Sequence, residues 1–133
     1  MKWVSSILLS AVIAVSAGSA QAGLESEKDI NDGLLVIAAA DKIRRACDSI
    51  GGRLFTARSY ANQIKDMASE RGYSDAEIEA YINNKQEKAK MRERRNAYFQ
   101  SKGASNLDAQ SLCVLGRDEI ARGTQIGRLL KAK

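Results

Sequence analysis

The sequence predicts an all-α protein: about four helices, one of them long, in a compact bundle that one disulfide ties together. Three observations predict this fold. The 133 residues include no proline, which favours long uninterrupted helices. Apolar residues recur at intervals of three and four, and no alternating strand pattern of any length is present. Two cysteines, Cys47 and Cys113, lie far apart in the chain.

The first 22 residues have the pattern of a secretory signal peptide. Lys2 precedes the apolar run Val4–Ala17, and Ala20-Gln21-Ala22 forms a small-x-small cleavage site. As a helix this apolar run spans roughly 21 Å, less than a hydrocarbon core of roughly 30 Å, which disfavours the alternative of an uncleaved anchor. We therefore expect cleavage after Ala22, a periplasmic location, and a single helical domain over residues 23–133 without a membrane-spanning segment.

Composition restricts the chemistry that this domain can perform. Residues 23–133 hold twenty of the 21 basic residues and all 16 acidic ones, so their net charge is +4. The chain has no histidine, which removes the commonest general base and the commonest transition-metal ligand. Asp118-Glu119 and the pair Glu77 and Glu79 are interpreted as surface or ion-pairing groups. We expect neither an enzyme nor a bound metal or cofactor.

Cys47 and Cys113 are predicted to form one structural disulfide, because an even number of cysteines in an oxidising compartment favours pairing. The alternatives are a redox pair and a metal site. Redox pairs usually lie close in sequence, whereas these cysteines are 66 residues apart, and a metal site would need two carboxylate ligands. In the chain-entropy model, closing such a loop stabilises the fold by about 4 kcal/mol. The bridge would bring the first and last helices into contact.

The first two helices are defined by their apolar stripes and by glycine stops. The first is predicted over Leu34–Ile50 and is ended by Gly51-Gly52; the second runs from Arg53 to Glu70, and Gly72 follows it. The stripe of the first helix comprises Ile30, Leu34, Ile37, Ile43, Cys47 and Ile50.

The third helix has the clearest start in the chain. Ser74 and Glu77 have the spacing of a capping box, in which each side chain accepts a hydrogen bond from the backbone of the other. The helix is predicted to continue to Ser101, with Gly103 as its stop. At about 27 residues it would be about 40 Å long.

The fourth helix begins near Ser105 or Asn106, and Gly123 ends it. Gly116 lies on its apolar face, where the missing side chain would let a neighbouring helix approach closely. Residues 124–130 form a short apolar tail of about one more turn.

The middle of the third helix is strongly basic, because Lys85–Arg95 holds six basic and two acidic residues. Four of the basic residues fall within a wedge of about 80° on a helical wheel, and we call them the basic ridge: Lys85, Lys88, Arg92 and Arg95. In one interpretation their aliphatic stems cover the edge of the core. In the other, the ridge faces an acidic protein, an anionic lipid surface or another subunit. Nucleic acid is not expected, given export and the small net charge.

The C-terminal segment resembles a known group of sequences. Together with the upstream Cys47, the pattern is Leu112-Cys113-x-x-Gly116-Arg117-x-Glu119-Ile120-Ala121-x-Gly123-Thr124-x-Ile126-Gly127-x-Leu129-Leu130. It is similar to a small family of exported alphaproteobacterial proteins, a domain of unknown function. The resemblance implies a periplasmic helical domain and assigns no catalytic residues.

Together these observations predict a non-enzymatic accessory or interaction protein of the periplasm. The basic ridge is the expected contact surface for an unknown protein partner or an anionic surface. The alternative function is a periplasmic chaperone or stress protein, because small disulfide-tied helical domains can expose apolar faces when they are destabilised.

Overall fold

The computed structural model describes residues 23–133, most of which are helical, and this confirms the all-α prediction. The predicted leader, residues 1–22, lies outside the described residues. In chain order the elements are a 3₁₀ turn (Leu24–Ser26), α1 (Lys28–Ala46), β1 (Ile50–Gly52), α2 (Leu54–Glu70), α3 (Asp75–Asn83), α4 (Lys85–Ser101), α5 (Ala109–Arg122), α6 (Gln125–Arg128) and β2 (Leu130–Ala132).

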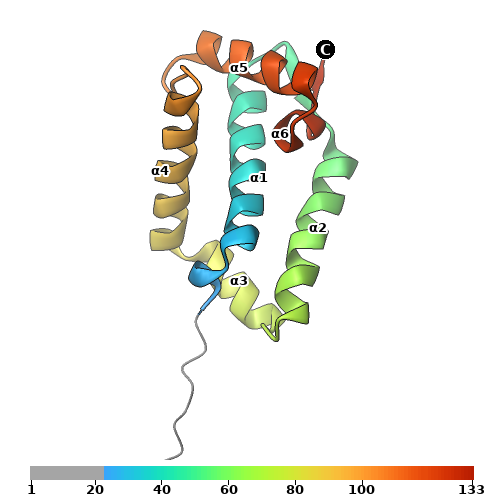
Figure 1. The fold of residues 1–133 in the computed structure, drawn as a ribbon, viewed down its shortest axis with the longest axis vertical. Coiled ribbons are helices and arrows are strands. Elements are labelled where there is room, and N and C mark those ends of the chain that lie inside the picture. Colours follow the sequence, from blue (N-terminus) through green and yellow to red (C-terminus); the bar gives the residue numbers. More distant parts are fainter. Residues whose placement is uncertain (1–22) are drawn as a thin grey trace, which may run out of the picture.

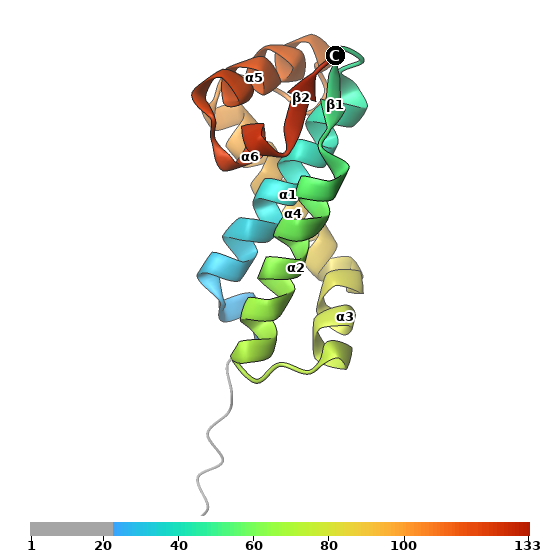
Figure 2. The same ribbon diagram turned by 90° about the vertical axis from the view of Figure 1, so that its right-hand side faces the viewer.

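Helix α1 lies at the centre of the molecule, with α2 on one side and α4 on the other (Figure 1). The short α3 joins α2 to α4 across one end of α1. Helices α5 and α6 and the two strands gather at the opposite end (Figure 2). Because α2 and α4 flank α1 on two sides only, part of the surface of α1 between them stays uncovered.

The first helix ends at Ala46 instead of Ile50, and a strand follows it. Cys47 already has an extended backbone (φ −118°, ψ 109°). Residues 50–52 form β1, which pairs with β2 in an antiparallel two-stranded sheet, Ile50 opposite Ala132. Two consecutive glycines disfavour a helix here, and β2 supplies backbone hydrogen-bond partners. Since those partners come from the far end of the chain, no local pattern predicts the strand.

The predicted disulfide joins Cys47 to Cys113, with a Cα–Cα distance of 5.2 Å, and so links the end of α1 to α5. Close packing adds to this link. An ideal Cβ on Gly116 would lie 2.7 Å from Cγ2 of Ile43 and 2.6 Å from Cδ1 of Ile50. The close approach predicted at Gly116 is therefore present, and it lets α5 lie directly against α1.

The expected third helix is divided into α3 and α4. Its start is as predicted, because Ser74 and Glu77 form the capping box. Asn84, however, has an extended backbone, and its side-chain oxygen accepts hydrogen bonds from the N–H groups of Gln86 (2.9 Å) and Glu87 (3.0 Å). Asparagine favours such capping positions over helix interiors. The chain therefore changes direction at Asn84, and α4 can run back along α1.

Buried apolar side chains form two clusters along α1. The larger lies around its C-terminal half and includes Ile43, Phe99 of α4 and Leu112 of α5. The smaller lies around its N-terminal half and is completed by the turn and by α2 and α3; its buried members are Leu24, Ile30, Ile64, Ala68 and Ile78. Ile37 and Tyr60 pack against both clusters, so the two are joined at the middle of α1.

Candidate functional site

Helix α1 carries more apolar side chains than its neighbours cover. Residues 33–40 read Gly-Leu-Leu-Val-Ile-Ala-Ala-Ala, so apolar groups point in every direction around this stretch. Leu34, Ile37 and Ala38 share one face and remain only half-buried. Leu34 and Ile37 belong to the apolar stripe predicted for the first helix. Their partial exposure has no local signal in the sequence, because it depends on where α2 and α4 pack against α1.

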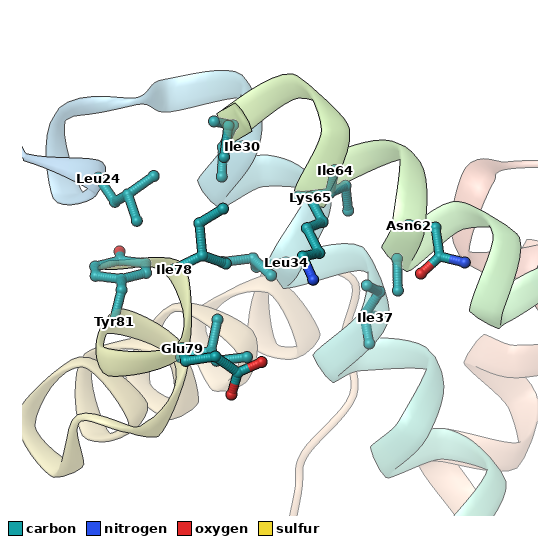
Figure 3. Close-up of a pocket in the computed structure, with 13 residues that line it drawn as sticks. Leu24, Ile30, Leu34, Ile37, Asn62, Ile64, Lys65, Ile78, Glu79 and Tyr81 are labelled. Atoms are coloured by element: carbon teal, nitrogen blue, oxygen red, sulfur yellow. The ribbon is translucent and has the colours of Figure 1, made fainter. Parts of the chain in front are cut away.

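A first hollow of about 200 Å³ opens between α1, α2 and α3 (Figure 3). Its apolar wall comprises Leu24, Ile30, Leu34, Ile37, Ala61, Ile64, Ala68, Ile78 and Ile82. The polar residues in its lining include Lys65 from α2 and Glu79 from α3, whose side chains are exposed. The hollow is therefore an apolar depression with charged groups at its edge.

Two further hollows follow along the same face of α1. The second, of about 260 Å³, lies between α1, α3 and α4, where Ala38 and Met91 belong to its apolar lining. The third, of about 140 Å³, lies near the end of α1, between Arg44 and Leu54. Ile37 lines all three hollows. They therefore form one continuous depression, which we call the α1 groove.

Two large apolar side chains in the lining of the α1 groove are exposed. Ile82 of α3, which lines the first and second hollows, is 41% exposed, and Leu54 of α2, which lines the third, is 69% exposed. Single exposed apolar residues are normal on protein surfaces. Here they continue an apolar depression, which is the arrangement that marks a ligand or protein contact.

The basic ridge lies along α4 beside this groove. Lys85, Lys88 and Arg92 are exposed, and Lys88 lines the second hollow. Arg95 is half-buried, with its guanidinium 5.9 Å from the ring centroid of Phe99. Burial lowers the pKa of Arg95, and repulsion by Arg92 and Arg45 acts in the same direction. Arg95 therefore covers the core, as the first interpretation of the ridge expects. Lys85, Lys88 and Arg92 extend into solvent.

The basic ridge forms no ion pair within the described chain, although Asp41 attracts Arg95 from a greater distance. Among residues 23–133, no carboxylate lies within 4.0 Å of the charged groups of the ridge. Glu87 and Asp41, which line the second hollow together with Lys88, are themselves paired: Glu87 with Lys90 (3.1 Å), and Asp41 with both Arg44 (2.6 Å) and Arg45. On its α4 side the α1 groove therefore presents the unpaired charge of Lys88 beside carboxylates that already have partners.

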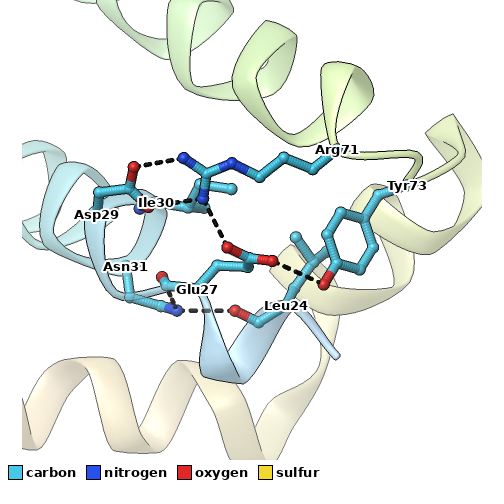
Figure 4. Close-up of polar contacts among 7 residues, drawn as sticks. All are labelled: Leu24, Glu27, Asp29, Ile30, Asn31, Arg71 and Tyr73. Carbon is cyan, nitrogen blue, oxygen red and sulfur yellow. Dashed lines mark hydrogen bonds and ion pairs between the residues drawn. The ribbon is translucent and has the colours of Figure 1, made fainter. Parts of the chain in front are cut away.

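A polar cluster lies beside the first hollow, next to Leu24 and Ile30 of its lining (Figure 4). Arg71, at the end of α2, pairs with Glu27 (2.6 Å) and Asp29 (2.5 Å), and the hydrogen bond from Arg71 lowers the pKa of Asp29 to about 2. The side-chain amide of the buried Asn31 donates to the carbonyl oxygens of Leu24 and Glu27, both at 2.8 Å. These contacts hold Leu24 in the wall of the first hollow.

The acidic residues considered from the sequence are engaged in structural contacts. Asp118 pairs with Arg122 at 2.8 Å, and Glu77 belongs to the capping box. Glu119, interpreted from the sequence as a surface group, is instead fully buried and accepts hydrogen bonds from Tyr98 and Thr124. Burial, followed by the hydrogen bond to Glu119, raises the pKa of Tyr98. Helical spacing is the signal that separates Glu119 from Asp118, because Glu119 lies three residues after Gly116 and seven after Leu112, on the apolar face of the helix.

Comparison with known proteins identifies a family. The model of a family described as "Family of unknown function (DUF5333)" matches residues 22–131. No curated protein and no solved structure matches the chain. Within residues 23–133, no helix is both long enough and apolar enough to cross a bilayer.

Proposed function

The chain belongs to the DUF5333 family of unknown function, and from this premise we propose that it is a non-enzymatic accessory protein of the periplasm that binds an acidic partner protein. The basic ridge and the adjoining α1 groove form the contact surface. Three of the acidic residues considered as catalytic candidates take part in capping, ion pairing and internal hydrogen bonds: Glu77, Asp118 and Glu119.

Two features support the periplasmic location. Residues 1–22 have the pattern of a signal peptide, and the family match begins at residue 22, where cleavage is expected. The bond between Cys47 and Cys113 is typical of proteins that fold in an oxidising compartment. The intact mass of the exported protein tests this location: it should correspond to residues 23–133 with one disulfide, and an unprocessed chain with free thiols would contradict it.

The observation that carries the proposed binding is the uncompensated charge on α4. Lys85, Lys88 and Arg92 occupy successive turns of one helix face, and like charges at this spacing repel each other. Two other arginines, by contrast, have carboxylate partners on a different element: Arg71 of α2 pairs with Glu27, and Arg94 on another face of α4 pairs with Asp32. A partner that brings carboxylates to α4 would relieve this repulsion and gain charge complementarity.

Charge reversal tests the proposal. The ridge-reversal variant is K85E/K88E/R92E; Arg95 is left unchanged because it packs on Phe99 and its replacement would disturb the core. The wild-type chain should cross-link to a stoichiometric partner in periplasmic and membrane fractions, and the ridge-reversal variant should not.

A matched control keeps this result specific to the ridge. The control variant, R58E/K131E/K133E, changes the net charge by the same amount at exposed residues of α2 and the C-terminal strand region that line none of the three hollows. It should retain the partner. Equal recovery with the ridge-reversal variant, or equal loss with the control variant, would contradict a role for the ridge.

The chaperone alternative is supported by three further exposed apolar side chains. Phe55 and Leu107 are 90% exposed, and Val114 is 57% exposed. They lie on α2, in the loop before α5 and on α5, so they do not extend the α1 groove. Suppression of aggregation of an unrelated denatured protein would favour the chaperone, whereas recovery of one partner in a fixed ratio favours the accessory role.

A further inference from the structure

We propose that the α1 groove receives an amphipathic helix of the partner, with its apolar stripe against α1 and its carboxylates facing the basic ridge. This inference rests on the proposed function, because it assumes a partner protein that carries acidic groups. It adds which structural element of the partner binds, and where.

The spacing of the hollows matches the spacing of side chains on a helix. The hollows follow one another along α1. The first lies beside Ile30 and Leu34, the second beside Leu34 and Ala38, and the third beside Ile37 and Arg44. Each hollow is therefore displaced by about one helical turn from the previous one. A helix lying beside α1 presents one apolar side chain per turn, at positions i, i+3 or i+4, and i+7, and so places one in each hollow.

The length of the groove also suits a helix. From Ile30 to Arg44, α1 rises about 21 Å, which is the length of a helix of about 14 residues. Exposed apolar side chains continue along this distance, since Ile82 lines the first and second hollows and Leu54 lines the third.

An acyl chain fits this groove less well than a helix. The hollows are open to solvent along one side and do not form a closed tunnel. A hydrocarbon chain laid in an open groove would keep part of its surface in water, which costs free energy in proportion to the apolar area left exposed. An amphipathic helix buries one apolar stripe and leaves its own polar face in solvent.

Charge determines how the bound helix is oriented. On the α4 side, Lys88 lies in the wall of the groove, with Arg92 one turn further along the same helix. On the floor, the charge of Asp41 is already compensated by Arg44 and Arg45. The flank of the bound helix that faces α4 therefore carries glutamate or aspartate.

Synthetic peptides test this inference without knowledge of the partner. The probe is a fluorescently labelled helical peptide of about 14 residues with leucines at successive i, i+3 and i+7 spacings and glutamates along one flank. One comparison peptide carries lysine in place of glutamate, and another has the same composition in scrambled order. By fluorescence anisotropy the acidic amphipathic peptide should bind the full chain, and the lysine and scrambled peptides should bind at least about tenfold more weakly.

Variants of the protein locate the bound peptide. Ala38→Trp fills the second hollow, and Ala121→Trp places the same side chain at an exposed position of α5 that lines none of the three hollows. Peptide affinity should fall at least about tenfold with Ala38→Trp and stay unchanged with Ala121→Trp. Circular dichroism should show the same helix content in both variants.

Three outcomes would overturn the inference. The first is that the acidic peptide does not bind the protein at about millimolar concentration. Another is binding that Ala38→Trp leaves unchanged while the ridge-reversal variant loses it; the proposed function would then stand and the groove would not be its site. The third is binding of phosphatidylglycerol vesicles that Ala38→Trp abolishes, which would assign the groove to lipid.

Discussion

An ideal Cβ on Gly127 would lie 2.0 Å from the carbonyl oxygen of Glu119, because the backbone of α6 packs directly on the last turns of α5. This carbonyl oxygen belongs to the backbone, so it cannot move away by a rotamer change as a side-chain atom can. We therefore expect Gly127→Ala to destabilise the protein by about 3 kcal/mol, the upper part of the range for overpacking a buried site. Urea unfolding followed by circular dichroism measures this change.

Gly33 provides the matched control. Its Cβ would lie 2.7 Å from Cδ1 of Ile64, which is the mobile end of a side chain. Replacing a helical glycine by alanine also gains about 1 kcal/mol of helix propensity. Gly33→Ala should therefore change the free energy of unfolding little. Equal losses at Gly33 and Gly127 would show that the backbone contact in α6 does not determine the cost.

Removal of the disulfide should destabilise the fold substantially. The bond between Cys47 and Cys113 spans 66 residues, for which the chain-entropy model gives about 4 kcal/mol. Urea unfolding of the wild type should shift to lower concentration in reductant by this amount. The Cys47→Ser/Cys113→Ser variant should be equally unstable with and without reductant, and a wild type insensitive to reductant would contradict the prediction.

Asn84 should contribute to stability as the cap of α4. Asn84→Ala removes the acceptor for two backbone N–H groups at the start of α4 and should cost about 1 kcal/mol in unfolding free energy. Asn83→Ala removes only a side-chain contact to the exposed Glu79 and should be nearly neutral. If thermal unfolding shows equal losses for the two variants, the cap does not account for the effect of Asn84.

Acid should weaken the contact between Arg71 and Asp29. The pKa of Asp29 falls from 3.8 to about 2 in the folded protein, so this carboxylate stabilises the fold above its unfolded pKa and loses that effect as pH falls through the folded one. The difference in unfolding free energy between the wild type and Asp29→Asn should therefore be constant above about pH 5 and shrink between about pH 4 and pH 2. Salt should reduce it, since Asp29 is exposed.

The Arg71→Ala background isolates this contact. Without the guanidinium, the pH dependence of the effect of Asp29→Asn should become much smaller, because only the weaker hydrogen bonds from backbone N–H groups still lower the pKa of Asp29. If the pH dependence is equally large in the Arg71→Ala protein, a group other than Arg71 causes it.

Local signals in the sequence were sufficient for several features of the fold. Three of the glycines predicted to end helices, Gly72, Gly103 and Gly123, have the positive φ that such a turn requires (91°, 75° and 60°). Gly51 and Gly52, predicted to end the first helix, instead lie in β1. The capping box at Ser74 is present for a similar reason, since both of its partners lie within four residues. Cysteine number and compartment predicted the disulfide, and with it the contact between α1 and α5.

Features that depend on distant parts of the chain were not predictable in the same way. The strand at Ile50 requires backbone partners near the C-terminus, and the burial of Glu119 requires Tyr98 from α4. The basic ridge was visible from charge alone. The α1 groove beside it was not, because the exposure of Leu34 and Ala38 depends on where α2 and α4 pack.

Site-specific photo-crosslinking in living cells tests most directly whether the surface beside Lys88 contacts an acidic partner. A photoreactive amino acid at position 88 should yield one cross-linked protein adduct, and the same amino acid at position 58 on α2, away from the α1 groove, should yield none. Adding Lys85→Glu and Arg92→Glu should abolish the adduct at position 88. The absence of an adduct at position 88, or the same adducts at both positions, would contradict the assignment of this surface as the binding site.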